Sequence, residues 1–464
     1  MKRIFDLIAV LCSRVVNSCP DGSLFVRYSC ISTAARETMQ HRLFQNLPFL
    51  FEKTAQGMLT VRQFTEERQT PYRLDCLETY METLSQQEDA FAMIYLLQIL
   101  DAALETLLLD IIREYQREDF SVVLNTNREI TGIGLLPRTS CVWERKHRLF
   151  HSYNRLDNFL THLLLLDHHI LGELIDKHYF LKQELFPHFA ATKSIKVAVS
   201  PLRLERCFEV IADEKNMVQY FHVQYTGEDF RTENERLWQK ILAAARNESD
   251  MVVFPEMLGN PAMQEDISQR LKRLNERERR KMPSLIFLPS VWDNHQNTVI
   301  ILDKNGDTVC KQTKQNPFRD EVNGTGYLED IRTNMVVNIL HYEGIGRIAV
   351  LVCKDFITTA YMEQLMRCFR LTLIIVPSFS TGSYDFRQSF DLCAHDDCNV
   401  VWINTCAALQ KGKEANFENI GYVRKRIGRN DDDSQKLCEM PICQGAFEGR
   451  CSHECLFIET IRGV

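Results

Sequence analysis

The chain has 464 residues, of which 45% are hydrophobic and 25% are charged, and its formal net charge is −7. This is an ordinary globular composition, with enough residues for two or three domains. The negative charge argues against a dedicated nucleic-acid binder, which usually carries a basic excess, but leaves room for a local basic patch. No stretch approaches the roughly 18 apolar residues that a membrane span needs, so we expect no membrane partner.

The sixteen cysteines are scattered along the chain. Their spacing does not match the framework of a small secreted disulfide scaffold, so we expect reduced thiols in a cytoplasmic protein. The first twelve residues superficially resemble a signal peptide, but Asp6 interrupts the apolar run and no small-residue cleavage site follows. We therefore expect Met1–Cys12 to form an amphipathic helix that docks on the protein.

Residues 1–190 have the pattern of a helical domain. Apolar residues recur at helical spacing in Leu74–Leu84, Ala90–Tyr115 and Leu156–Leu185, and the second stretch predicts one long, largely buried helix. We expect an all-α domain that offers contacts to a partner protein or to other copies of the chain. The linker to the next domain is expected around Pro187–Lys193.

Two groups of residues raise the question of a metal site. His147 and His151 share a predicted helix face, but no glutamate completes a zinc-protease arrangement. The second group lies near the C-terminus and consists of Cys438, Cys443, Cys451 and Cys455, with His453 among them. Four soft ligands suit tetrahedral zinc, yet the paired C-x2-C spacing is absent. We expect simple thiols and no metal or cofactor, and leave zinc open.

From Ile195 onward, predicted strands and helices alternate, which indicates an α/β fold. Arg203–Phe230 is a less regular excursion, with Tyr220–Tyr225 as a candidate added strand. Gln264–Lys281 is a heavily charged helix whose mixed signs predict a solvated face, with a nucleic-acid contact as the alternative.

Three stretches of this second half end in residues that can do chemistry. An apolar strand that begins at Asp250 is expected to end at a proline, and Glu256 follows that proline directly. A hairpin with an Asn-Gly turn runs from Asn297 to Lys314. A third apolar strand runs into Cys353, and helix-compatible residues follow, so strand, sharp turn and helix are expected.

Each of these residues has an ordinary interpretation when taken alone. A lone cysteine is more often structural than catalytic, a glutamate after a strand is a common turn residue, and a lysine on a strand is usually solvated. The position of Cys353 nevertheless favours chemistry, because a thiol at the start of a helix lies near backbone amides that stabilise a thiolate or an oxyanion.

In the order Glu, Lys, Cys, the three stretches resemble the nitrilase (carbon–nitrogen hydrolase) superfamily, over about residues 195–464. Further matching strands and helices follow in the family's order: Lys196–Ser200, Glu235–Asn247, Leu373–Ser378, Phe390–Asn404 and Ile420–Arg424. The resemblance implies a four-layer α-β-β-α sandwich, preceded here by the all-α domain.

The resemblance also implies roles at the site. Cys353 would attack the carbon of a small amide or nitrile and form a thioester-type intermediate, releasing ammonia or an amine. Glu256 would carry the proton. Lys314 would stabilise the oxyanion together with the backbone N–H of Lys354, and would lower the pKa of the thiol. Asp355 completes the cysteine motif and is taken as a supporting residue.

Many family members carry a second glutamate soon after the lysine. Glu321, seven residues beyond Lys314, is the candidate, with Asp320 and Glu329 as rivals. Asn297 resembles the asparagine that opens the family's hairpin, and its role is taken as structural.

The chain departs from the family at Lys354, where many relatives carry an aromatic or acidic residue. It also departs at Ala394–Asp397, which replaces an Arg-Ala-x-Glu pattern. These positions shape the pocket mouth in relatives, so the substrate stays undetermined. Relatives commonly pair through helices beside the cysteine, so a homo-oligomer through Ala360–Cys368 and Tyr384–Cys393 is expected.

Two other functions fit the same sequence. One is an N-acyltransferase, in which an amine rather than water resolves the thioester. The other is a non-catalytic scaffold whose helical half binds a partner. Divergent nitrilase-like domains with added helices resemble those found with reverse transcriptases in bacterial phage defence, which suggests a setting for such a scaffold.

Overall fold

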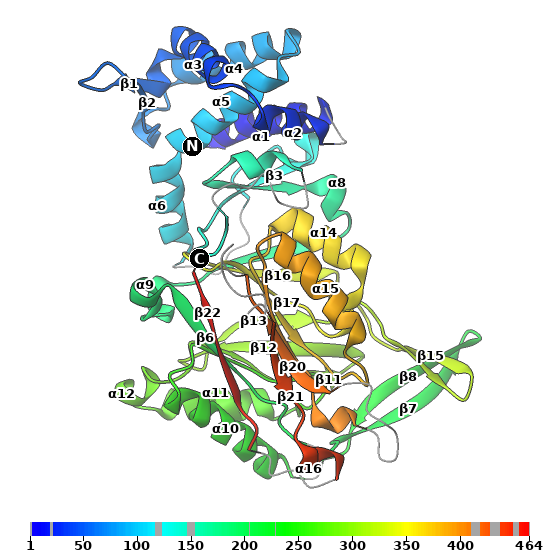
Figure 1. Cartoon of the computed structure of the whole chain (residues 1–464). Coiled ribbons are helices and arrows are strands. Elements are labelled where there is room, and N and C mark those ends of the chain that lie inside the picture. The colour runs from blue at the N-terminus through cyan, green and yellow to red at the C-terminus, as the bar shows by residue number, and fades with distance from the viewer. Residues whose placement is uncertain are drawn as a thin grey trace.

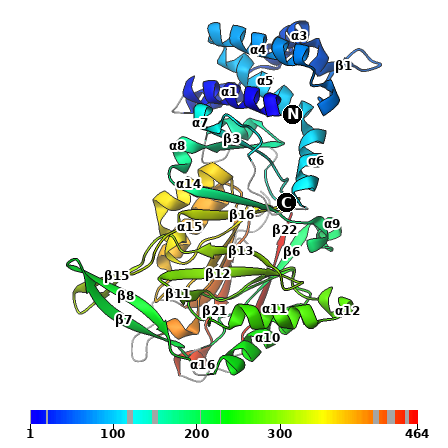
Figure 2. The same cartoon turned by 180° about the vertical axis from the view of Figure 1, so that it is seen from behind.

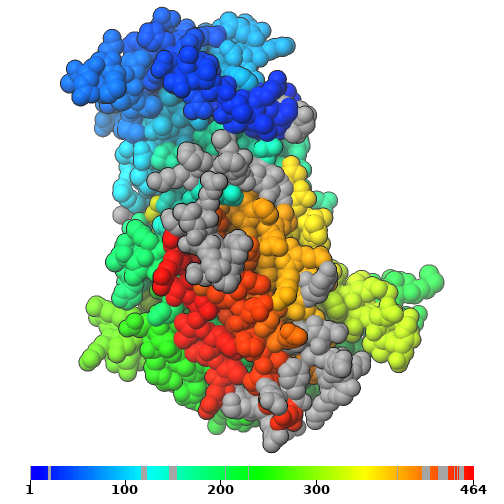
Figure 3. All heavy atoms as spheres, in the orientation of Figure 1, coloured from blue at the N-terminus to red at the C-terminus, as the bar shows by residue number. Residues whose placement is uncertain are grey.

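The computed structural model describes residues 2–18, 22–116, 123–145, 154–203, 205–227, 229–409, 418–426, 437–448 and 454–463. Figure 1 shows a mainly helical upper lobe, a lower lobe built on two sheets, and an arm of long strands that projects from the lower lobe. In the space-filling view of Figure 3, the arm stands out from the side of the molecule, away from the upper lobe.

The upper lobe packs its other helices around the largely buried helix α5. Its first helix is amphipathic and docked, as predicted, because Ile4, Ile8, Leu11 and Val15 all point into the core. The helices are α1 (Lys2–Ser18), α2 (Ser23–Ser29), α3 (Thr33–Asn46), α4 (Pro71–Gln86), α5 (Ala90–Ala103) and α6 (Glu105–Tyr115).

The prediction of one long helix over Ala90–Tyr115 is wrong. The chain bends by 57° between α5 and α6. At the bend, the carbonyl of Ala103 accepts a hydrogen bond from the N–H of Phe64 instead of continuing one straight helical ladder. Among the described helices, none is by itself both long and apolar enough to cross a membrane, and α5 and α6 reach those criteria only when taken together.

The prediction of an all-α domain is also wrong. Leu156–Leu185 contains β4 (Leu163–Asp167), the short helix α8 (His168–Leu171) and β5 (Ile175–Phe180). A run of four leucines fits a buried strand as well as a helix, and here β4 pairs antiparallel with β3 (Ile133–Pro137). A further small hairpin joins β1 (Phe51–Lys53) to β2 (Leu59–Val61).

The boundary near residue 190 is not a structural division either. Strand β5 pairs in parallel with β16 (Val336–Tyr342), so the second sheet of the lower lobe begins before the expected linker. Within that linker, residues 189–192 form the short helix α9 (Phe189–Thr192), and the ring of Phe189 packs on Tyr342. The local pattern could not reveal a strand partner so distant in the sequence.

The first sheet of the lower lobe has the strand order β11-β12-β10-β9-β6-β22, with β13 also paired to β12. Successive side chains of a strand point to opposite faces of the sheet. In β9, Met251 and Val253 therefore point into the core shared with the second sheet, whereas Val252 points toward α10 and α11. The elements are β6 (Ser194–Val199), β9 (Met251–Val253), β10 (Leu285–Phe287), β11 (Val291–Asp293), β12 (Gln296–Asp303), β13 (Thr308–Thr313), β22 (Phe457–Arg462), α10 (Phe230–Arg246) and α11 (Met263–Arg273).

The second sheet has the order β21-β20-β19-β18-β17-β16-β5. Its buried strands β17, β18 and β19 run parallel to one another, and two helices pack against it, as Figures 1 and 2 show. The elements are β17 (Gly346–Val350), α14 (Thr359–Phe369), β18 (Leu373–Pro377), α15 (Tyr384–His395), β19 (Asn399–Ile403), β20 (Asn419–Arg424) and β21 (Leu437–Pro441).

The arm is a four-stranded sheet of order β14-β15-β8-β7. The excursion expected at Arg203–Phe230 is a regular hairpin of β7 (Phe208–Lys215) and β8 (Val218–Tyr225), which contains the predicted added strand. Strand β15 (Thr325–Glu329) pairs with β8 and, through a tight turn, with β14 (Arg319–Val322).

The charged segment Gln264–Lys281 is two helices rather than one. Helix α11 ends at Arg273, and α12 (Glu276–Arg279) restarts with a capping box in which Asn275 and Glu278 hydrogen-bond each other's backbone N–H. Two N–H donors at the new helix start are thereby satisfied, which stabilises the break.

Candidate active site

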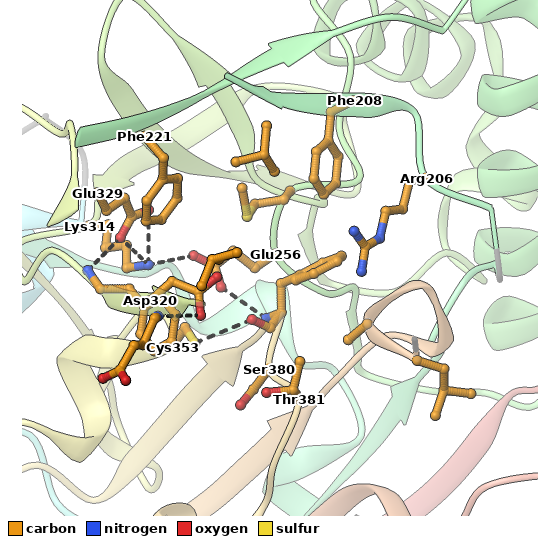
Figure 4. A pocket seen from close by; sticks show the side chains of 18 of the residues that line it. Arg206, Phe208, Phe221, Glu256, Lys314, Asp320, Glu329, Cys353, Ser380 and Thr381 are labelled. Atoms are coloured by element: carbon orange, nitrogen blue, oxygen red, sulfur yellow. Dashed lines mark hydrogen bonds and ion pairs between the residues drawn. The ribbon is translucent and has the colours of Figure 1, made fainter. Parts of the chain in front are cut away.

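Glu256, Lys314 and Cys353 meet in one pocket of about 390 Å³. Glu256 follows β9 after Phe254 and a proline, Lys314 directly follows β13, and Cys353 lies between β17 and the short helix α13 (Lys354–Ile357). The strand ends thus bring together three side chains that are far apart in the sequence, as Figure 4 shows.

The ammonium group of Lys314 lies at the floor of this pocket, between two carboxylates. Its Nζ donates to Glu256 Oε1 at 2.9 Å and lies 2.8 Å from Glu329 Oε2. Burial by itself would lower the pKa of Lys314, but the negative charges of Glu256 and Glu329 outweigh it and raise that pKa well above its ordinary value. Lys314 is therefore a permanent cation and a hydrogen-bond donor, not a base.

Both oxygens of Glu256 are held in place. Asn297 donates to Oε1 at 2.7 Å, and the backbone N–H of Phe379 donates to Oε2 at 2.9 Å. The carbonyl of Asn297 also accepts from the N–H of Lys314 at 2.9 Å. Asn297 thus does more than shape the hairpin, because it positions the glutamate and the lysine together.

Cys353 has a backbone conformation that is unusual for a residue with a side chain. Its φ is +47°, and its N–H donates to the carbonyl of Pro377 at 3.0 Å. Its Sγ lies 3.9 Å from the carbonyl oxygen of Phe379. A strained turn of this kind is typical of functional positions, since the surrounding structure must supply the free energy that holds it.

Lys314 acts on the pKa of the Cys353 thiol in the expected direction, which is downward, but other groups raise that pKa by more. Burial raises the pKa of the Cys353 thiol, and the nearby Glu256 carboxylate raises it further. Lys314 opposes both effects without reversing them. Cys353 is consequently a neutral thiol next to a carboxylate that can accept its proton.

Asp355 joins the cysteine turn to the lysine loop. Its carboxylate accepts from the N–H groups of Gln315 at 3.0 Å and Asn316 at 2.7 Å, and from that of Val352 at 3.2 Å. Burial raises its pKa to about 6. The neighbouring Lys354 has a half-buried side chain, and its backbone N–H finds no acceptor among the residues that the structure describes.

The structure places Glu329, and not Glu321, beside Lys314. Glu321 and Asp320 lie on the exposed strand β14 and reach only the pocket rim, whereas Glu329 is buried at the end of β15. The N–H of Phe318 donates to Glu329 Oε2 at 2.7 Å. The chain reverses at Asn323 and Gly324, so the later glutamate returns to the lysine. The Asn323-Gly324 pair is a sequence signal for this second hairpin, which the sequence analysis did not use.

The arm forms the roof of the pocket, a role that the sequence analysis did not predict. Phe208 from β7 and Phe221 from β8 lie over the site, while Ser380 and Thr381, which follow β18, lie below it (Figure 4). Arg206, just before β7, lies at the end away from Lys314. Glu256, Lys314 and Cys353 therefore follow strands of the two sheets of the lower lobe, whereas the roof belongs to the arm sheet.

The residues considered as metal ligands fall partly outside the described ranges. His147, His151, Cys451 and His453 lie outside the described residues. Within the described ranges, no three histidine, cysteine or acidic side chains are grouped so that they could hold a metal ion.

No protein-family model matches the chain, and no curated protein sequence matches it. Among solved structures, an amidase from Nesterenkonia sp. is 13% identical, with a TM-score of 0.38 over 58% of this chain and 90% of its own. Saccharomyces cerevisiae Nit3, described as a nitrilase-superfamily member, is 16% identical, with a TM-score of 0.37 over 58% and 90%. The C. elegans NitFhit protein is 16% identical, with a TM-score of 0.35 over 59% and 61%. Identities and scores this low leave the site itself to decide the function.

Proposed function

We propose that this chain is a cysteine-dependent hydrolase of non-peptide carbon–nitrogen bonds, acting on small amides or nitriles. The observation that carries the proposal is the buried ammonium of Lys314, held between Glu256 and Glu329 in the pocket that contains Cys353. A purely structural site would have little reason to bury two carboxylates, one ammonium and a thiol around an open space, because each buried charge costs free energy.

The first half of the reaction on an amide forms a thioester. Cys353 Sγ attacks the carbonyl carbon while Glu256 takes the thiol proton. The carbonyl oxygen gains negative charge, which Lys314 and the backbone N–H of Lys354 stabilise. When the tetrahedral species collapses, the C–N bond breaks, and the leaving nitrogen receives the proton from Glu256 and departs as ammonia or an amine.

The second half releases the acid. A water molecule attacks the thioester carbon, and Glu256 accepts one of its protons. The C–S bond then breaks, and the sulfur recovers the proton, so the thiol is regenerated. Glu329 does not exchange protons in this scheme. It holds Lys314 from the side opposite to Glu256, and its own position is fixed by the Phe318 N–H.

We also assign the lower lobe to the four-layer α-β-β-α arrangement of the nitrilase superfamily. Support comes from the two seven-stranded sheets, whose facing sides share one apolar core, and from the helix pairs packed against each sheet. The order of Glu256, Lys314 and Cys353 along the chain, each at a strand end, supports the same assignment.

The test is ammonia release from a panel of small primary amides, with mass spectrometry of the intact protein to trap the acyl group on Cys353. Cys353→Ala should abolish release and trapping. Cys368→Ala is the matched control, because it removes another buried thiol, on α14, outside the pocket lining. Release that persists in Cys353→Ala would refute the proposal.

A further inference from the structure

We propose that the basic surface Lys272–Lys281, at the end of α11 and along α12, binds the phosphate backbone of double-stranded nucleic acid without regard to its sequence. Figures 1 and 2 both place α12 at the edge of the lower lobe, on the side opposite to the arm. No residue of Gln264–Lys281 lines the pocket of the candidate active site, so this binding would not depend on the chemistry of Cys353.

The basic surface concentrates positive charge in a chain that is negative as a whole. Its ten residues include six arginines and lysines and two glutamates, a net charge of +4, whereas the whole chain carries −7. Both glutamates are already engaged within the surface. Glu276 pairs with Arg280, and the Glu278 carboxylate accepts from the N–H of Asn275 at 3.1 Å. The charge that remains for a partner is therefore positive.

Three exposed cations of the basic surface have no anionic partner of their own. Arg273, Arg277 and Lys281 form no ion pair with any residue that the structure describes. Lys272 makes an exposed pair with Asp307 at 3.3 Å, which a phosphate group can replace easily, because exposed pairs contribute little free energy. When such cations neutralise phosphates, the nucleic acid releases condensed counterions, and this release drives binding.

The backbone that carries these cations is held in place by the chain itself. Arg279 is half-buried, and its Nη2 donates to the carbonyl oxygens of Lys272 at 3.1 Å and Leu274 at 2.9 Å. This arginine ties α12 to the end of α11 across the break, which the capping box at Asn275 also stabilises. Cations on an ordered backbone lose less conformational freedom on binding than cations on a loose loop.

The basic surface lacks the apolar groups that a protein or membrane partner would need. Throughout Gln264–Lys281, which the structure describes in full, no large apolar side chain is exposed. Protein interfaces form around a desolvated apolar or aromatic core, and helices that lie on a membrane bury an apolar face in it. The segment also contains no aromatic residue on which an unpaired base could stack. A duplex, with its bases already stacked and its phosphates outside, fits these constraints.

Binding can be measured by fluorescence anisotropy, with the full chain and a labelled DNA duplex of about 20 base pairs and arbitrary sequence, over a series of salt concentrations. We expect the logarithm of the association constant to fall linearly with the logarithm of the salt concentration. The slope should be about −3 to −4, as three or four phosphate contacts require. A duplex RNA of the same length should bind within about threefold, because both duplexes present a phosphate backbone.

The triple variant Arg273→Gln/Arg277→Gln/Lys281→Gln removes the three unpaired cations. It should bind the DNA duplex at least about tenfold more weakly at low salt, and its slope should shrink to about −1. The variant Arg273→Lys/Arg277→Lys keeps the charge and should bind within about threefold of the unchanged chain, because lysine also binds phosphate as a point charge.

The matched control removes three exposed cations elsewhere, in Arg27→Gln/Arg36→Gln/Lys177→Gln, and should leave binding nearly unchanged. An equal loss in the two triple variants would overturn the inference, as would the absence of duplex binding at low salt or a slope near zero. Tighter binding of a single strand than of the duplex would also overturn it. The same holds if the basic surface proves to serve phosphatidylserine vesicles or self-association, so that its triple variant loses one of these and keeps the duplex.

Discussion

The floor and the rim of the pocket are built on opposite principles. On the floor, Glu256, Lys314 and Glu329 are at most 2% exposed, and each makes at least two polar contacts. On the rim, Arg206 and Glu321 are exposed, and the arginine has no ionic partner among the described residues. Fixed, mutually neutralising charges suit a reaction that is always the same, whereas an exposed charge without an ionic partner suits the selection of a ligand.

The largest effect should come from Glu256→Gln. This change should act in opposite directions on hydrolysis and on the alkylation of Cys353. Without its proton carrier, hydrolysis should fall about a hundredfold to ten-thousandfold. Alkylation of Cys353 by limiting iodoacetamide should instead become faster at a given pH, since the carboxylate that raises the thiol pKa is gone. Peptide mass spectrometry over a pH series measures the second effect. A slower alkylation would contradict the electrostatic account of the resting thiol.

Lys314→Met should remove the cation that holds the two carboxylates on the floor of the pocket. Loss of an oxyanion donor lowers hydrolysis by about a hundredfold to a thousandfold. Alkylation of Cys353 should slow, because Lys314 is the group that lowers its pKa. Two buried carboxylates would then face each other without a cation, at a cost of about 3–5 kcal/mol in the free energy of unfolding, measured in urea.

Lys272→Met is the control for stability. Lys272 makes an exposed ion pair with Asp307 at 3.3 Å, and the loss of such a pair usually costs less than about 1 kcal/mol. Similar losses of stability in the two variants would show that Lys314 is not the buried, doubly paired cation described above.

Two glutamates of the same hairpin sharpen the comparison between floor and rim. Glu329→Gln removes one of the two charges that hold Lys314, and hydrolysis should fall about tenfold or more, as for other changes that loosen a catalytic group. Glu321→Gln lies on the exposed strand β14 and should change hydrolysis of an uncharged amide by less than about twofold. Initial rates of ammonia release by the two variants measure this difference. A larger loss in Glu321→Gln would restore it as the second glutamate.

A separate prediction concerns Asp355 and is a pH dependence of the free energy of unfolding. Burial raises its pKa from 3.8 to about 6, so between these values the folded protein binds the proton more tightly than the unfolded chain. The resulting stability is present below about pH 4 and is lost as the pH rises through about 6. In Asp355→Asn, the free energy of unfolding should lose this falling slope. Identical slopes in the two proteins would contradict the raised pKa.

The catalytic candidates could be predicted because each lies at the end of a strand with a strong local signal. Glu256 follows an apolar run and a proline, and Cys353 ends another apolar run. The choice between Glu321 and Glu329 depended on how the chain returns after Lys314. A count of residues favoured the nearer glutamate, but a two-residue turn decides which side chain reaches the lysine.

The N-terminal half was harder for a related reason. The leucines of β4 satisfy a strand and a helix equally well, and only pairing with β3 settles the choice. Strand β5 belongs to the sheet of the other lobe because of a partner some distance away in sequence, β16. The arm joins two hairpins separated by most of the first sheet. Patterns within short windows carry no information about such pairings.

The pairing of β15 with β8 links the roof of the pocket to its floor. Phe221, which covers the pocket, is the cross-strand neighbour of Glu329, which anchors the ammonium. A change in the arm that alters the roof of the pocket therefore also shifts β15, the strand that carries Glu329. The same two strands therefore shape the space for a ligand and hold the lysine of the site. Substitutions that admit a new ligand must also keep Lys314 in place, which restricts how this pocket can evolve.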